Sequence, residues 1–543
     1  MPRNDRVDCF VPRNDRVDCF PSMGSGQAVP RNDNEKEKFI YMKKIIVVFC
    51  ALILILGLRG EYGNPTIDDL NSSRWMDKGP FELSPERGRF ALVYSLIEDQ
   101  SLDFSGEVAK FAIPDVGYLR GKYVSLFNPG VSFLTIPGYL IGREFGLSQV
   151  GTFAIIPIFA ILNVLLIRAI AIHFGARNLI ATLAGIVFLF ATPGFTYAET
   201  LYQHHVSTFL ILLSYYRLAS KQNNWTYAGV WLCMGTAILI DYPNLFLMAP
   251  FGIYLLSKIL IVNRNRQETL IRFNIKALLA GGVVIVPLVI FLVFNKLAYD
   301  DPFQLSGTVQ TVKELEANNV QQAGEELTSD KQRQKEAVRF FNSRNLLNGL
   351  YILLFSADRG VVVYTPVIIL GLAGIGIALK KNIKLTALGS AIVGVNIVIY
   401  ALWGDPWGGW AFGTRYLIPA FAVLAVYLAL FLSFVNKRTI VYMVFWMLFV
   451  YSGAINTVGA ITTSSVPPKI EILALEEATK RPQKYTFEKN YDLLGNDLSK
   501  SFLFRMIANK YLTAWQYYSL LTFLVLYAGS VLLITDYLKN KDV

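Results

Sequence analysis

Long apolar runs separated by short polar connections recur along almost the whole chain. A hydrocarbon core requires about 20 apolar residues per helix, and backbone groups inside lipid must bond to one another, so these runs predict membrane-spanning helices. About twelve are expected, at 44–58, 150–172, 178–196, 205–220, 225–240, 243–260, 275–296, 361–379, 385–403, 416–435, 439–461 and 517–538. The pattern therefore predicts an all-α polytopic membrane protein with a long first external loop that carries juxtamembrane helices.

The lysines and arginines near these runs fall on one side, which the positive-inside rule makes cytoplasmic. They are Lys43, Lys44, Arg168, Arg177, Arg217, Lys221, Lys258, Arg264, Arg266, Arg272, Lys380, Lys381, Lys384, Lys437, Arg438, Lys539 and Lys541. The assignment requires the moderately apolar segment 131–142, which contains Pro137, to be interfacial or re-entrant. A thirteenth crossing there is the alternative, and it would invert every later loop.

With this topology the external face collects the long loops 59–149, 297–360 and 462–516. Catalytic and binding groups concentrate on loops held by a rigid scaffold. A transporter more often carries ionisable residues inside its spans, and here the span interiors have almost none. The distribution favours an enzyme that works at the outer surface of a cell (inner) membrane.

The domain boundaries follow from the same pattern. The sequence PRNDRVDCF occurs at 2–10 and again at 12–20 without an apolar period, so we interpret 1–41 as a disordered extension or a translated repeat ahead of a native start at Met42. We expect an N-terminal transmembrane catalytic module at 42–300, an external region at 301–360 and a C-terminal transmembrane module at 361–543.

The composition of the chain and the motifs that it lacks exclude several classes of protein. Hydrophobic residues make up 53% of the chain, which is too apolar for a soluble protein of 543 residues. The net charge of +11 is scattered over short connections, so we expect no nucleic-acid partner. No phosphate-binding glycine loop, zinc motif or nucleophile elbow occurs, and the glycines 371, 374 and 376 lie in an apolar run where close helix packing is the usual reason for small residues. A reaction outside the cytoplasm would therefore require an activated substrate that is carried by a membrane lipid.

Acids and cations of the first external loop are candidates for chemistry. Glu86 precedes Arg89 by three residues, which on a helix places a base beside a cation or makes a surface ion pair. Asp115 has two interpretations, a turn residue or a second acid of the site. Lys122 likewise is interpreted as a phosphate contact or as a solvated cation. Asp68 and Asp69 are paired acids, a metal site or helix caps.

Later external corners add further candidates. His204 and His205 lie where a helix begins, beside Tyr202, and suit either a site or interfacial polarity. Asp241 ends an apolar run, so it faces protein, a cavity or water. Arg415, followed by Tyr416 and set among aromatic residues and glycines, suits a clamp on phosphate oxygens better than Arg359, which follows Asp358.

Four segments, in this order, resemble the GT-C superfamily of integral-membrane glycosyltransferases, in the bacterial branch of protein mannosyltransferases and the lipid A aminoarabinose transferase. They are ERGRFALVYSLIEDQSLDF at 86–104, IPDVGYLRGKYVSLFNPGVSFLTIPGYLIG at 113–142, ATPGFTYAETLYQHHVSTFLILL at 191–213 and WGGWAFGTRYLIPAF at 407–421. Relatives often have Asp where Glu86 stands, and the loop before it is longer here, which leaves Asp68 and Asp69 as rival bases.

The resemblance implies transfer of a sugar from a polyprenyl-phosphate donor to a hydroxyl of a lipid, glycan or protein, with inversion at the anomeric carbon. It implies that Glu86 and Asp115 are the acids. It also implies that the substrate or the phosphate is bound by Arg89, Lys122, Tyr202, His204, Arg415 and Tyr416. A groove between helices would hold the isoprenoid, no soluble cofactor is required, and a divalent metal near the acids is allowed. The alternatives are a transporter or lipid flippase without chemistry, and a glycan polymerase or ligase with a lipid-diphosphate donor.

Overall fold

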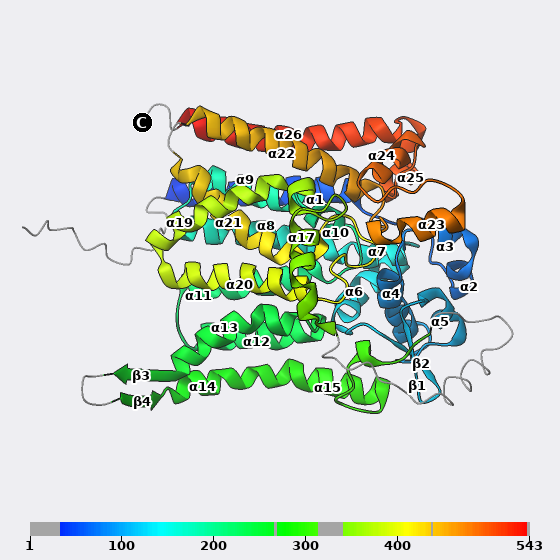
Figure 1. Cartoon of the computed structure of the whole chain (residues 1–543), viewed down its shortest axis with the longest axis horizontal. Coiled ribbons are helices and arrows are strands. Elements are labelled where there is room, and N and C mark those ends of the chain that lie inside the picture. The colour runs from blue at the N-terminus through cyan, green and yellow to red at the C-terminus, as the bar shows by residue number, and fades with distance from the viewer. Residues whose placement is uncertain (1–32, 265–268, 313–339, 436–437, 540–543) are drawn as a thin grey trace, which may run out of the picture.

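Helices form nearly all of the structure, a computed structural model that describes residues 33–264, 269–312, 340–435 and 438–539 (Figure 1). Each predicted apolar run coincides with a helix or a broken helix. These are α1 (Asp33–Gly57), α8 (Ile155–His173), α9 (Asn178–Phe190), α11 (His204–Ser220), α12 (Asn224–Ile240), α13 (Asn244–Ile259), α14 (Ile275–Gly281) with α15 (Ile285–Tyr299), α18 (Val361–Tyr364) with α19 (Gly371–Lys381), α20 (Ile383–Leu402), α21 (Ile418–Phe434), α22 (Thr439–Ile461) and α26 (Ala514–Lys539).

Six helical stretches of the described residues are long and apolar enough to cross a membrane. They are Ser148–His173, Ile275–Tyr299, Ile383–Leu402, Arg415–Phe434, Thr439–Ile461 and Ala514–Lys539. Only 22% of the most apolar window of Ile275–Tyr299 is buried, and large side chains such as Ile275, Leu279 and Ile290 are exposed. Such a continuous apolar surface is favourable in lipid and costly in water. The chain is a membrane protein, and the count of about twelve crossings stays a prediction.

The N-terminal boundary differs from the expected one. Helix α1 begins at Asp33, ahead of Met42, so the predicted disorder is wrong for residues 33–41. The glutamates and lysines of this stretch favour helix, so the helix continues ahead of the apolar run. The repeated sequence itself, at residues 1–32, lies outside the described residues.

The external loops of the sequence analysis gather at one end of the helices (Figure 1). Their elements are α2 (Ile67–Asn71), α3 (Ser73–Lys78), α4 (Ser84–Ile97), α5 (Gly106–Ala112), β1 (Val116–Leu119), β2 (Lys122–Ser125), α6 (Gly130–Glu144), α7 (Ser148–Phe153), α10 (Gly194–Ala198), β5 (Thr311–Val312), α17 (Leu346–Leu354), α23 (Ile472–Thr479), α24 (Glu488–Gly495) and α25 (Phe502–Met506). The hairpin of β3 (Leu260–Arg264) and β4 (Thr269–Phe273) lies at the opposite end (Figure 1).

Hydrogen bonds join these external segments to one another. Strand β1 pairs antiparallel with β2 and with β5, and the second pairing ties the first loop to the segment after α15. The backbone N–H of Ser464 donates to Glu82 Oε2 at 2.7 Å, which ties the first loop to the segment after α22. The predicted convergence of the three loops is therefore confirmed for their described parts.

Helix α6, which contains the segment predicted to lie at the interface, has 15 residues and includes Pro137. It is about 22 Å long at 1.5 Å per residue, shorter than a hydrocarbon core of about 30 Å. It packs against α4 and α7 and is not among the six candidate spans of the described residues. Its length agrees with the interfacial placement.

The packed core of helices holds the loop 404–417 in a fixed position. Helix α21 packs against α8, α9, α11, α19 and α20, and 83% of its most apolar window is buried. Helices from both predicted transmembrane modules thus share one core, and the division into modules stays a prediction. Because α21 is packed on many sides, the loop 404–417 that leads into it is held rigidly at the end where the long loops gather.

Close packing of α19 on α21 supports the interpretation of Gly371 and Gly374, but not that of Gly376. A Cβ on Gly374 would lie 1.9 Å from the carbonyl oxygen of Tyr427, whereas a Cβ on Gly376 would meet nothing within 4 Å. We expect Gly374→Ala to lower the free energy of unfolding by about 1–3 kcal/mol, because the helices must separate. Thermal unfolding in detergent checks this, with Gly376→Ala as the matched control. Equal unfolding temperatures for the two variants would contradict it.

Candidate functional site

A cavity of about 560 Å³ lies between α4, the corner of α12 and α13, α15, the end of α20 and the loop before α21, at the end of the helices that the sequence predicts to be external. Most of its wall is apolar, with side chains such as Phe127, Ile238, Phe246, Phe291 and Trp403. Polar and charged side chains also line it, among them those of Arg89, Gln203, Asp241 and Arg415. This combination of apolar walls and a few placed polar groups is typical of a ligand site.

Two arginines share one aromatic ring in this cavity. The guanidinium carbon of Arg89 lies 5.4 Å from the ring centroid of Tyr202, and that of Arg415 lies 4.7 Å from it. Cation–π attraction holds both groups in place, although two like charges repel each other. An anion bound between them would relieve that repulsion, so the geometry suits a phosphate group.

Arg415 keeps N–H groups available for such a ligand. Its Nη2 donates to the carbonyl oxygen of Gly408 at 2.6 Å, while its Nε and Nη1 are buried without a hydrogen-bond partner. Gly408 has a φ of +73°, which brings this loop against the guanidinium group at a conformation that favours glycine. Buried donors without partners are costly, so these two N–H groups favour an oxygen ligand.

Arg359 uses its donors differently. Its Nε donates to the carbonyl oxygen of Trp407 at 2.9 Å, and its Nη2 donates to those of Gly409 and Val466. It is fully buried and fixes the loop that precedes Arg415. Arg415 therefore has N–H groups available for a ligand, whereas the donors of Arg359 already have partners.

Arg89 begins a chain of hydrogen bonds across the cavity. It donates to Gln203 Oε1 at 2.7 Å, and Gln203 Nε2 donates to Asp241 Oδ2 at 2.9 Å. Burial raises the pKa of the Asp241 carboxyl, and the charge of Arg89 opposes the increase. Asp241 therefore faces a protein cavity, and it is the one carboxylate among the residues that line it.

Glu86 is close to this cavity without lining it. It is fully buried in the first turn of α4, where its carboxylate accepts hydrogen bonds from the backbone N–H groups of Glu82 at 3.1 Å and of Leu83 and Leu201 at 3.4 Å. Burial raises its pKa, the charge of Arg59 opposes this, and the charge of Glu82 adds to it. The surface ion pair with Arg89 is not found among the described residues, because Arg89 donates to carbonyl and amide oxygens.

Asp115 and Lys122 lie outside the cavity. Asp115 accepts a hydrogen bond from Ser84 Oγ at 2.6 Å, beside the first turn of α4. Lys122 is exposed at the start of β2. Their roles as second acid and phosphate contact are predictions that this placement does not support.

Asp68 and Asp69 are exposed in the first turn of α2. Asp69 Oδ2 accepts from the N–H of Thr66 at 2.9 Å and from its hydroxyl at 2.8 Å, while Thr66 Oγ1 accepts from the N–H of Asp69. This reciprocal cap is the alternative that the sequence left open. Among the described residues no group of three or more His, Cys, Asp or Glu is arranged to hold a metal ion.

We expect Asp69→Ala to lower the free energy of unfolding by about 1 kcal/mol, because the helix loses its cap. The hydrogen bonds from Thr66 lower the pKa of the Asp69 carboxyl. This stabilisation is therefore present above the unfolded-state pKa and is lost as the pH falls through the folded-state value. Denaturant unfolding of both proteins at neutral and acidic pH measures the effect. A difference between them that grows at acidic pH would contradict it.

His204 belongs to the aromatic surroundings of the arginines. It stacks on Tyr202 with ring centroids 5.7 Å apart, and its Nε2 is buried without a hydrogen-bond partner. Tyr416 lines the cavity and stacks on Tyr400 at 4.1 Å. His205 instead contacts the carbonyl oxygen of Gly194 through Nε2 at 2.7 Å.

The structure thus brings together Arg89, Tyr202, Arg415 and Tyr416 from the sequence prediction, with His204 directly behind them. Sequence reasoning missed Gln203, Asn128, Tyr400 and Trp403, which also line the cavity. Gln203 lies between Tyr202 and His204, which were both candidates, so a motif-based argument could have found it. The others carry no signal of their own.

No protein-family model and no curated protein matches the chain. Its structure is similar to that of ArnT from Cupriavidus metallidurans bound to undecaprenyl phosphate, with a TM-score of 0.45 and 13% identity, over 93% of this chain and 78% of that one. It is also similar to the apo oligosaccharyltransferase of Archaeoglobus fulgidus, with a TM-score of 0.43 and 14% identity, over 90% of this chain and 56% of that one.

A third similar structure is the Archaeoglobus fulgidus oligosaccharyltransferase AglB in complex with an inhibitory peptide and a dolichol-phosphate. The TM-score is 0.40 and the identity 15%, over 92% of this chain and 56% of that one, so this chain spans just over half of either oligosaccharyltransferase. Because all three TM-scores are below 0.5, the side chains of the cavity carry the functional proposal.

Proposed function

We propose that this protein is a membrane glycosyltransferase that moves a sugar from a polyprenyl-phosphate donor to an acceptor hydroxyl at the extracytoplasmic face. The observation that carries the proposal is the pair of arginines on Tyr202 at an apolar cavity, with two N–H groups of Arg415 unused. The order of motifs in the sequence, which resembles GT-C glycosyltransferases, supports the same function.

In this scheme the apolar wall holds the isoprenoid chain, and Arg89 and Arg415 bind the phosphate. When the acceptor oxygen attacks the anomeric carbon, the bond to the phosphate oxygen breaks and negative charge grows on the leaving phosphate. Arginines already fixed at that position stabilise this charge without further reorganisation. The attack from the opposite side of the ring gives inversion.

Glu86 is our candidate for the base that takes the acceptor proton. Burial raises its pKa, which strengthens it as a base, and it lies one helical turn from Arg89. Asp241 is the second candidate, because it lines the cavity. The scheme requires no soluble cofactor, and transfer measured with and without a chelator tests the divalent metal that the sequence allowed.

The test is to supply the full-length protein, in lipid nanodiscs, with polyprenyl-phosphate sugars and a panel of lipid, glycan and peptide acceptors. Release of polyprenyl monophosphate together with a glycosylated product is the expected result. Movement of the lipid across a vesicle without product would establish the flippase instead. Release of a lipid diphosphate would establish the polymerase or ligase.

A further inference from the structure

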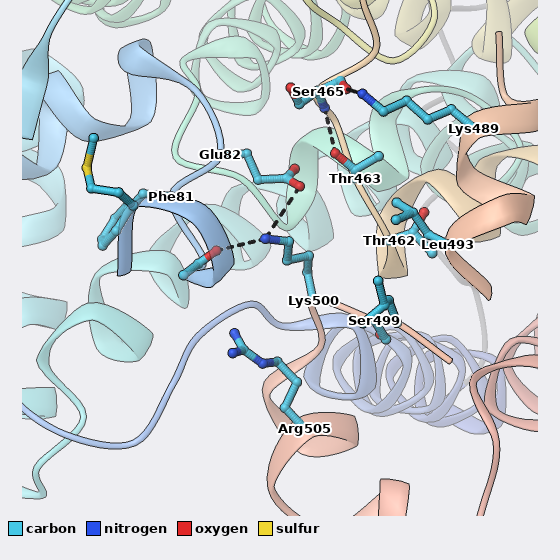
Figure 2. A pocket seen from close by; sticks show the side chains of 13 residues that line it. Phe81, Glu82, Thr462, Thr463, Ser465, Lys489, Leu493, Ser499, Lys500 and Arg505 are labelled. Carbon is cyan, nitrogen blue, oxygen red and sulfur yellow. Dashed lines mark hydrogen bonds and ion pairs between the residues drawn. The ribbon is translucent and has the colours of Figure 1, made fainter. Parts of the chain in front are cut away.

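A second cavity, of about 480 Å³, is lined by residues of the first loop and of the chain that follows α22 (Figure 2). It is formed by the segment before α4, the residues that follow α22, α24, and the chain that leads into α25. Glu82 lines it, while Arg89, farther along the same segment, lines the first cavity. Glu86, between these two residues in the sequence, lines neither cavity.

The lining of this cavity is cationic. Lys489, Lys500 and Arg505 face it, and Glu82 is the one carboxylate among its lining residues. Figure 2 shows Lys500 between Glu82 and Arg505, with Lys489 beside Ser465. The charge of Glu82 is already engaged, since it accepts from Arg59 Nη1 at 2.7 Å and from the N–H of Ser464 at 2.7 Å. Burial would raise the pKa of Glu82, but Arg59, Lys500 and hydrogen bonds from its neighbours lower it to about 2.

The cations keep unused capacity for an anion. Lys489 donates to the carbonyl oxygen of Ser465 at 2.8 Å, and Lys500 donates to that of Gly79 at 2.9 Å and lies 3.8 Å from Glu82 Oε1. An ammonium group has three donors, and a neutral carbonyl does not cancel its charge. Arg505 pairs with Glu61 through Nη2, while its Nη1 is buried without a hydrogen-bond partner.

Burial makes the positive charges of the two lysines energetically costly. It lowers the pKa of the Lys489 and Lys500 ammonium groups, and the charge of Glu82 only partly opposes this. The hydroxyl-bearing residues Thr463, Ser465 and Ser499 add polar lining, and Phe81, Leu493 and Leu498 add an apolar part. The cavity therefore suits an amphiphilic molecule with an anionic head group.

We propose that the second cavity binds a phosphate-bearing amphiphile, whose anionic group lies against Lys489, Lys500 and Arg505. This site is additional to the donor site of the proposed function. The phosphate group can belong to a lipid or to a soluble glycan.

The experiment measures binding to full-length protein in neutral detergent, by native mass spectrometry and by the shift in unfolding temperature. Phosphatidic acid is the lipid probe, inorganic phosphate is the soluble probe, and phosphatidylcholine is the neutral control. The protein carries Arg415→Ala throughout, so that phosphate binding at the first cavity is weakened. We expect at least one phosphate probe to bind and phosphatidylcholine not to bind.

Lys489→Gln and Lys500→Gln should each weaken this binding about tenfold, the value of one charge-assisted hydrogen bond. Lys510→Gln, at an exposed lysine nearby, should leave it within about twofold. Binding of phosphatidic acid alone assigns a lipid ligand, and binding of inorganic phosphate as well allows a soluble one. Equal binding of phosphatidylcholine, or unchanged affinity in both lysine variants, overturns the proposal. The readout needs no sugar transfer, so it is independent of whether the proposed function holds.

Discussion

Arg415→Ala should reduce sugar transfer at least about 100-fold, the effect of removing one preorganised donor to a developing anion. Arg415 offers two buried N–H groups with no partner in the described structure, and it lies over the ring of Tyr202. The loss should exceed any loss of donor binding, because the charge on the phosphate grows as the bond to the sugar breaks. Initial rates over a range of donor concentrations separate the two effects.

Two further variants test whether the loss of rate is specific to the guanidinium group of Arg415. Arg415→Lys keeps the charge but loses the planar fork, and we expect it to recover only a small part of the rate. Arg143→Ala is the matched control, since Arg143 is exposed at the same end and pairs with Glu98 at 3.2 Å, a contact of little energetic value. A wild-type rate in Arg415→Ala would remove the arginine from the mechanism.

Glu86→Gln should lower kcat about 1,000-fold while leaving the KM for the donor within a few fold, because a positioned base contributes about 100- to 10,000-fold. The amide oxygen can still accept the backbone hydrogen bonds of the first turn of α4, so the fold should persist. Asp241→Asn should instead mainly raise the KM for the donor, since Asp241 reaches Arg89 through Gln203.

The pH profile supplies an independent measurement for the same assignment. A base must be deprotonated, so transfer should fall as the pH drops through the raised pKa of Glu86. Glu86→Asp should keep this acid limb with a reduced maximum. If Asp241→Asn abolishes transfer while Glu86→Gln retains most of it, Asp241 is the base and the role of Glu86 is to hold Leu201 and the first turn of α4.

Much of the architecture followed from the sequence because lipid imposes simple constraints. Apolar runs must form helices there, and helices were found at all the predicted runs, including the one that ends at the loop before Arg415. The gathering of external loops followed from charge in the connections. The capping role of Asp69 was one of three alternatives, and only the contact with Thr66 decided among them.

The sequence by itself determined a helical membrane protein and predicted the end where its polar side chains collect, with Arg89, Tyr202 and Arg415 among the candidate site residues. These are local properties, since each depends on the apolar or polar nature of a short segment. Only the tertiary structure decided that Asp241 and Gln203 join the cavity, that Asp115 and Lys122 do not, and that Glu82 lines a second, cationic cavity. Those facts depend on contacts between segments hundreds of residues apart, such as that of Ser464 with Glu82, which no local pattern encodes.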